Sequence, residues 1–389
     1  MSVTRPKGFV ANGVHCGIKA GDALDLALVA TADGQPAPAA AVFTSNKAVA
    51  APVQVSRDHL AASGGYASAV VLNSGCANAA TGAAGRSDAE HTCALVAEGL
   101  GCMEADVLVC STGLIGYPLP MGALVAGVEP LLSGRKGTEA RGRRAAQAIM
   151  TTDTRPKETM IGAGLLTVGG MAKGAAMLAP NLATMLAVLT TDATATADEL
   201  QEALRIAVAE SFNALVVDGC QSTNDTVIVL ASGKGPAPPK GALAEALTMA
   251  CADLAEQMAD DAEGATKVAA IRVTGAASSE DARRAARRVA ESQLVQCSLH
   301  GADPYWGRIV SELGSSGAAF DPDRVSVAYG GVVVCRDGIA APHPEEKVRA
   351  HLAGRMVEVA ADLGLGEGAA TFLATDLSPA YIGENMRTS

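Results

Sequence analysis

Thr184 is the residue of this sequence best placed to act as a nucleophile. It is the single hydroxyl residue of the segment APNLATML (179–186), in which Pro180 and Asn181 disfavour a helix. A threonine at the start of a chain can work without a separate base. Its α-amine, which titrates near pH ~8, can accept the proton of its own hydroxyl. That amine becomes available only if the bond between Ala183 and Thr184 is cut.

The hydroxyl of Thr184 can perform this cut itself. It attacks the carbonyl carbon of Ala183, the acyl group moves from nitrogen to oxygen, and water hydrolyses the resulting ester. The small side chain of Ala183 leaves the carbonyl open to attack, and Pro180-Asn181 favours a bent backbone. Taken alone, the same pattern also fits an ordinary threonine of a core strand, because strands are enriched in threonine.

Other common catalytic motifs are absent from the sequence. It contains no GxxxxGK[ST] loop, no GxGxxG after a strand and no GxSxG turn. Its six histidines have neither the spacing of metal ligands nor the arrangement of a Ser-His-Asp triad. We therefore predict no metal site and no cofactor.

Charge and composition exclude several classes of partner. The 389 residues carry a net charge of −11, which opposes binding to nucleic acid, and RRAARR (283–288) fits the solvated face of a helix. No apolar run approaches the ~20 residues that span a membrane, and the first residues lack the apolar core of a secretion signal. The nine cysteines form no CxxC pair, as expected for reduced thiols. We predict a cytoplasmic protein that binds neither nucleic acid nor membrane.

Short apolar runs that end in polar or glycine turns predict strands. These runs cover 67–75, 106–113, 226–233 and 268–275, and 325–335 is expected to form a hairpin that turns at Gly330-Gly331. Their alternation with helical segments indicates an α/β fold with layered sheets and helices, and the length suits two domains or one two-lobed unit.

Helix-start signals and apolar periodicity predict the helices between these strands. Ser87 with Glu90 and Thr196 with Glu199 have the spacing of capping boxes. After Thr196, apolar residues recur every four positions, at Leu200, Leu204 and Val208, and predict one buried stripe. Two further helices are expected, over 242–258 and 280–293.

Eight sequence blocks closely resemble those of the ornithine acetyltransferase family, also called glutamate N-acetyltransferases, and they occur in the family order over nearly the whole chain. In order, they are NSGCANAATG (73–82), STGLIG (111–116), IMTTDTRPK (149–157), GGMAKGAAMLAPNLATMLAVLTTDA (169–193), SFNALVVDG (211–219), STNDT (222–226), EGATK (263–267) and ADPYWGRI (302–309). Each block alone is weak, but their combination is specific.

The resemblance implies a self-cleaving acetyltransferase with the layered α/β fold of that family. The chain would divide into an α chain (1–183) and a β chain (184–389) that stay together and assemble as a heterotetramer. In the implied ping-pong reaction, N2-acetylornithine gives its acetyl group to the threonine, ornithine leaves, and glutamate accepts the acetyl group in arginine biosynthesis. Some members also use acetyl-CoA, which leaves that donor open here.

The resemblance also assigns the residues of the reacting centre. Thr184 corresponds to the nucleophile and Ala183 to the residue before the cut. Thr112 and Gly113 correspond to the oxyanion hole, which stabilises the negative oxygen of the intermediate. Lys173 corresponds to a lysine that contacts substrate, and its charge would lower the pKa of the Thr184 amine. Without the resemblance, Thr112-Gly113 would be read as a plain strand-to-turn segment.

Further residues correspond to substrate ligands of the family. Thr151 matches a substrate-binding threonine, with Thr152 as the alternative if the register differs by one. Glu263 matches the acidic ligand of the substrate amino group, although a solvated loop acid is the alternative. Asn385 and Ser389 would close the site from the C-terminal tail, where three residues separate them instead of the usual four.

Four departures from the family pattern leave alternative functions open. Besides the shorter tail, they are Cys76, Cys220-Gln221 and Tyr305, which stand where asparagine, Asp-Thr and asparagine are usual. A specialised acyltransferase of secondary metabolism, an amidase or aminopeptidase with the same nucleophile, and an uncleaved scaffold are the alternatives to the acetyltransferase.

Overall fold

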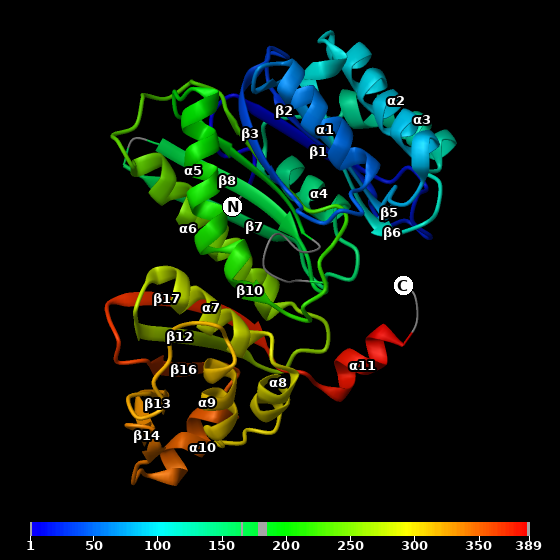
Figure 1. Cartoon of the computed structure of the whole chain (residues 1–389). Helices are drawn as coiled ribbons and strands as arrows, with labels where there is room; N and C mark the ends of the chain where they lie inside the picture. The colour runs from blue at the N-terminus through cyan, green and yellow to red at the C-terminus, as the bar shows by residue number, and fades with distance from the viewer. Residues whose placement is uncertain (1, 165, 178–184, 387–389) are drawn as a thin grey trace.

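Two β-sheets lie face to face in the larger part of the molecule and carry helices on their outer faces (Figure 1). The structure is a computed structural model that describes residues 2–164, 166–177 and 185–386. The first sheet has the order β1-β2-β5-β6 and consists of β1 (Phe9–Val14), β2 (Leu26–Thr31), β5 (Ala69–Cys76) and β6 (Val107–Leu114).

The second sheet has the order β4-β3-β11-β9-β8-β7. It consists of β4 (Tyr66–Ala67), β3 (Ala37–Phe43), β11 (Thr226–Ala231), β9 (Leu186–Thr191), β8 (Leu166–Lys173) and β7 (Lys157–Ala163). Its central strands β9 and β11 are buried along their whole length, because one face packs on the first sheet and the other on helices. This explains why both strands read as continuous apolar runs in the sequence.

Helices complete four layers, which we call the αββα unit. The outer face of the first sheet is covered by α1 (Ala51–Ala62), α2 (Gly82–Leu100) and α3 (Met121–Ser133). The outer face of the second sheet is covered by α5 (Ala197–Glu210) and α6 (Ala242–Asp260), and α4 (Glu139–Ala148) packs in the core between the sheets. Short 3₁₀ turns lie at Glu104–Asp106 and Phe212–Ala214.

A seven-stranded sheet forms a second, C-terminal unit with its own core. In sheet order it consists of β10 (Leu215–Val216), β17 (Gly368–Thr375), β12 (Val268–Ala276), β16 (Met356–Asp362), β13 (Ser326–Tyr329), β14 (Val332–Arg336) and β15 (Ile339–Ala340). Its helices are α7 (Ser279–Ala290), α8 (Gln293–His300), α9 (Gly307–Gly314) and α10 (Glu345–Ala353). The last helix, α11 (Pro379–Asn385), leaves this unit and runs toward the C-terminus (Figure 1).

The predicted elements agree with the structure except at two helix boundaries. The hairpin turns at Gly330-Gly331, both with positive φ, and the Thr196–Glu199 capping box starts α5. The prediction for Ser87 is wrong, because α2 already begins at Gly82 and Ser87 lies inside it. A pair spaced i and i+3 fits a helix interior as well as a helix start. The predicted helix 280–293 is two helices, because α7 ends at Ala290.

The predicted junction between the α chain (1–183) and the β chain (184–389) lies outside the described residues. The strands on either side of it are neighbours in the second sheet, where β8 and β9 pair from Lys173↔Leu186 to Val168↔Thr191. The αββα unit therefore contains strands from both predicted chains. Within the described part of the chain, no helix combines the length and apolar character needed to cross a membrane.

Candidate active site

The carboxyl ends of β5 and β6 place Thr112 and Gly113 beside the start of a turn. The two strands run parallel, with Ser74 opposite Thr112 and Gly75 opposite Gly113. Gly113 has φ +127°, and a Cβ there would lie 2.3 Å from the backbone carbon of Gly75. Only glycine fits this position, which leaves the backbone at the strand end free of a side chain.

Lys173 reaches from the second sheet to this strand end. It is the last residue of β8, its exposed fraction is 3%, and its Nζ donates a hydrogen bond of 3.3 Å to the Thr112 hydroxyl. Thr112 is 2% exposed, so the contact is buried. The structure thus brings together two of the residues predicted to carry the chemistry, from two different sheets.

The charge of Lys173 depends on its surroundings. Burial lowers its pKa, and the carboxylate of Asp153 is the strongest influence in the opposite direction. A buried ammonium without such a counter-charge would lose its proton. The carboxylates of Asp225 and Glu263 add smaller raising effects, and the ammonium of Lys157 acts against them.

Asp225 fixes the first residue of the described segment that leads into β9. Its Oδ1 accepts a hydrogen bond of 2.8 Å from the Met185 N–H. Its Oδ2 has no hydrogen-bond partner among the described residues although the side chain is fully buried. Burial raises the pKa of Asp225 well above its ordinary value. Ala183 and Thr184, the residues of the predicted cut, lie outside the described residues, and Thr184 directly precedes Met185 in the sequence.

Thr151 and the end of β8 share one carboxylate. Asp153 accepts a hydrogen bond of 3.0 Å from the Thr151 N–H and one of 2.8 Å from the Gly174 N–H. Its Oδ1 also lies 2.6 Å from Lys157 Nζ in a buried ion pair. The predicted Thr151 is half-buried near Lys173 through this link, whereas the alternative Thr152 is exposed.

Glu263 and Asn385 form a direct contact between the loop after α6 and the C-terminal helix. Asn385 Nδ2 donates a hydrogen bond of 2.9 Å to Glu263 Oε2. The N–H of Glu263 donates one of 2.9 Å to the carbonyl of Ala175, two residues beyond Lys173. Glu263 is half-buried, unlike the solvated loop acid that was its alternative. Ser389 lies outside the described residues.

A second contact holds α11 against the same segment. Asp218 Oδ2 accepts hydrogen bonds from the Met177 N–H, at 2.6 Å, and from the Tyr381 hydroxyl, at 3.2 Å. Burial raises the pKa of Asp218, and these hydrogen bonds oppose the shift. The segment that follows Lys173 is thereby fixed at Gly174, Ala175 and Met177.

Among the departures from the family pattern, Cys220 contacts this site, because its N–H donates a hydrogen bond of 3.0 Å to Asp218 Oδ1. Cys76, at the end of β5, is buried and its thiol contacts the Tyr117 carbonyl at 3.4 Å. Cys220 and Tyr305 are exposed, and all nine cysteines are free thiols. Among the described residues, no three His, Cys, Asp or Glu side chains gather in a group that could hold a metal ion.

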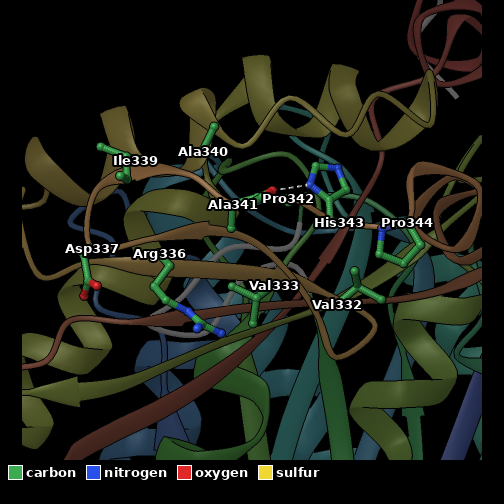
Figure 2. Close-up of a pocket in the computed structure, with 10 residues that line it drawn as sticks. All are labelled: Val332, Val333, Arg336, Asp337, Ile339, Ala340, Ala341, Pro342, His343 and Pro344. Carbon is green, nitrogen blue, oxygen red and sulfur yellow. Dashed lines mark hydrogen bonds between the residues drawn. The ribbon is translucent and has the colours of Figure 1, made fainter.

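A cavity of about 460 Å³ lies elsewhere, in the C-terminal unit (Figure 2). Figure 2 shows that β14, β15 and the following segment line the cavity. The His343 ring is hydrogen-bonded to the carbonyl of Ala341, at 2.7 Å. None of the predicted catalytic or substrate-binding residues lines this cavity, so we do not assign the reaction to it.

Comparison with known proteins identifies the family. A model of the ArgJ family matches residues 10–388. The "Arginine biosynthesis bifunctional protein ArgJ" of Thermobifida fusca is 47% identical, with 100% of both chains covered. The protein of the same name from Mycobacterium tuberculosis is 48% identical, with 100% of this chain and 96% of its own covered. The crystal structure of ornithine acetyltransferase from M. tuberculosis complexed with ornithine is 45% identical, covers 46% of this chain and 94% of its own, and has a TM-score of 0.42.

The layered α/β fold and the buried hydroxyl–ammonium site are those of an enzyme. The chain belongs to the ArgJ family. The predictions of the family, of the fold class and of an acetyltransferase of arginine biosynthesis are confirmed.

Sequence reasoning missed Asp153, Lys157, Asp218 and Asp225, although all four lie in or beside blocks that carried the resemblance. A charged residue is normally exposed, so nothing in its type predicts burial. The available signal was position, because Asp225 directly precedes the continuous apolar run of β11 and Lys157 begins β7.

Proposed function

We propose that this chain transfers the acetyl group of N2-acetylornithine to glutamate through an acetyl ester of Thr184. The products are ornithine and N-acetylglutamate. The observation that carries this proposal is the buried contact between Lys173 Nζ and the Thr112 hydroxyl. This contact joins two of the expected reacting groups. Met185, the residue bonded to Thr184, is held by its hydrogen bond to Asp225.

The nucleophile is generated by cleavage between Ala183 and Thr184. The Thr184 hydroxyl attacks the Ala183 carbonyl and the C–N bond breaks, which frees the α-amine of Thr184 and leaves an ester on its oxygen. Water hydrolyses this ester to the Ala183 carboxylate and the Thr184 hydroxyl. The sheet supports this step, since β9 pairs along its whole length with Val168–Lys173 of β8 and holds both products together. Asp225 supports it as well, because its hydrogen bond holds the residue next to Thr184.

The transfer then proceeds in two half-reactions. The Thr184 amine accepts the hydroxyl proton while the oxygen attacks the acetyl carbonyl of N2-acetylornithine. The bond to the substrate nitrogen breaks, the proton passes to that nitrogen, and ornithine leaves. The amine of glutamate attacks the acetyl ester in the same way, which restores the Thr184 hydroxyl.

Thr112 and Gly113 stabilise the negative oxygen that forms in each half-reaction. The Thr112 hydroxyl and the Gly113 backbone N–H are the donors, and the missing side chain at Gly113 lets a substrate oxygen approach. The neighbouring ammonium of Lys173 favours a neutral, basic Thr184 amine by like-charge repulsion. Both half-reactions use the same donors, which suits a ping-pong sequence.

The acidic contact between Glu263 and Asn385 recognises the amino-acid part of the substrate. Its carboxylate pairs with a substrate ammonium, and Asn385 orients the carboxylate through the hydrogen bond to Oε2. Thr151 contacts the substrate from the loop before β7, and Ser389 closes the site from the C-terminal tail.

The enzyme is cytoplasmic, and its α and β chains form a heterotetramer. Native mass spectrometry of the purified protein tests this assembly.

The decisive assay incubates purified enzyme with N2-acetylornithine and glutamate. Formation of N-acetylglutamate with equimolar ornithine is expected. Release of free acetate without N-acetylglutamate contradicts the transferase and identifies an amidase. A parallel incubation with acetyl-CoA and glutamate tests whether the same ester forms from the second donor.

A further inference from the structure

Asp153 joins three segments of the site through one buried carboxylate. Its exposed fraction is 7%, and it accepts hydrogen bonds from the N–H groups of Thr151 and Gly174. It also forms an ion pair with Lys157 at 2.6 Å. The loop before β7 and the end of β8 therefore both bind the Asp153 carboxylate, so a substitution of Asp153 affects both segments.

Lys157 does not need Asp153 for charge compensation. Its Nζ also lies 2.5 Å from Asp261 Oδ2, and that carboxylate is itself fixed by the N–H of Thr154 at 3.0 Å. Lys157 and Asp261 form a neutral buried pair on their own. The second carboxylate, Asp153, is thus available to compensate other cations: it accepts a hydrogen bond from the Gly174 N–H next to Lys173, and it acts on both Lys173 and Lys19.

The charges around Lys173 support this assignment. The charged groups that shift the pKa of Lys173 are Asp153, Lys157, Asp225 and Glu263. Lys173 in turn shifts the pKa of Lys19, in the loop after β1. Asp153 is the strongest of the four, and Asp261 is not among them. The pair is reciprocal: burial raises the pKa of Asp153, but Lys173 and Lys157 outweigh burial and lower it to about 2.

We propose that Asp153 is a positioning residue of the acyl-transfer site. Its carboxylate sets the spacing between the Thr151 and Lys173 segments and keeps the buried Lys173 ammonium charged. The spacing and charge are properties of this chain alone; their role in catalysis rests on the function proposed above.

The charge on Lys173 can be measured without catalysis. In a Thr184→Ala background, lysines labelled with ¹³C and ¹⁵N are titrated by NMR, and Lys173 is assigned by loss of its signal in Lys173→Met. Asp153→Asn is expected to lower the Lys173 midpoint by roughly one to three pH units. The matched control Asp261→Asn removes the same charge from the same cluster and is expected to lower the midpoint by less, because Asp153 stays in place. An unchanged midpoint in Asp153→Asn, or equal shifts in both variants, overturns the proposal.

The catalytic consequence is read from the pH profile of the cleavable enzyme. Asp153→Asn is expected to move the alkaline limb of kcat/KM to lower pH, and Asp261→Asn is expected to move it by less. An unmoved limb in Asp153→Asn overturns the positioning role. If the unaltered enzyme makes no N-acetylglutamate, the proposed function fails, yet the NMR titration still decides whether Asp153 controls Lys173.

A loss of folding in Asp153→Asn is tested with one further variant. The double variant Asp153→Asn with Lys173→Met also removes the buried Lys173 ammonium, which the first substitution leaves without its counter-charge. It is expected to restore soluble protein and to have a higher urea midpoint than the single variant. A double variant no more stable than Asp153→Asn contradicts the link between the two residues.

Discussion

Replacing Thr112 by valine removes one hydroxyl from the candidate site while keeping the shape of the side chain. Thr112 is 2% exposed in β6, and a branched residue suits this strand. The hydroxyl accepts a hydrogen bond of 3.3 Å from Lys173 Nζ, whose main counter-charge is Asp153. We therefore expect the free energy of unfolding to fall by only about 1 kcal/mol.

The same change removes one donor to the reacting oxygen. Loss of an oxyanion donor weakens the transition state by about 3 kcal/mol, which corresponds to a fall in kcat of roughly 100- to 1,000-fold. The KM values are expected to change little, because the donor acts mainly on charge that develops during the reaction.

Initial rates of N-acetylglutamate formation, measured over a range of both substrates, give kcat and KM for Thr112→Val. The control Thr112→Ser keeps the hydroxyl and is expected to retain most of the turnover. A Thr112→Val enzyme with normal kcat and a raised KM would refute the oxyanion role and make Thr112 a substrate contact instead.

Further predictions concern substrate recognition and acid stability. Glu263→Gln is expected to raise the KM for the amino-acid substrates roughly 10- to 100-fold through loss of a charge-assisted contact, while the surface control Asp260→Asn leaves KM unchanged; equal effects in kinetic assays would discard the assignment. Asn385→Ala is expected to raise KM by less than Glu263→Gln, since it removes the orienting hydrogen bond but keeps the Glu263 charge, and an unaltered KM would remove Asn385 from the site. The pKa of Asp153 is about 2 in the folded chain against 3.8 as its ordinary value, so its ionised form stabilises the fold by roughly 2 kcal/mol above pH ~4 and this contribution disappears as pH falls through ~2. Urea unfolding of the wild type and Asp153→Asn should therefore differ at pH 7 and converge near pH 2, and a constant difference would contradict the ion-pair account.

Local patterns predicted most of the framework. Periodicity located the apolar stripe of α5, and glycines located the turn between β13 and β14, because both depend on neighbours in sequence. The start of α2 was missed although its N-cap is Thr81, because its first turn, GAAG, contains two glycines and no acidic residue. The pairing of the two sheets could not be read from the sequence, since it depends on contacts between distant strands.

The candidate site was predictable where the chemistry names a residue type. Chemistry alone pointed to Thr184, and the family resemblance supplied Thr112, Gly113, Lys173, Glu263 and Asn385. The buried carboxylates were not predictable, because burial of a charge depends on partners from other segments. Asp153 acquires its role only after the fold brings Gly174 and Lys157 to it.

The central claim is that the chain cuts itself to create a reactive amine on Thr184. Intact-mass measurement combined with N-terminal sequencing of freshly purified protein tests it most directly. Two chains are expected, one ending at Ala183 and one beginning at Thr184, and the Thr184→Ala variant is expected to remain a single chain of 389 residues. A single uncut chain in active wild-type protein, or a cut at the same bond in Thr184→Ala, would contradict the account.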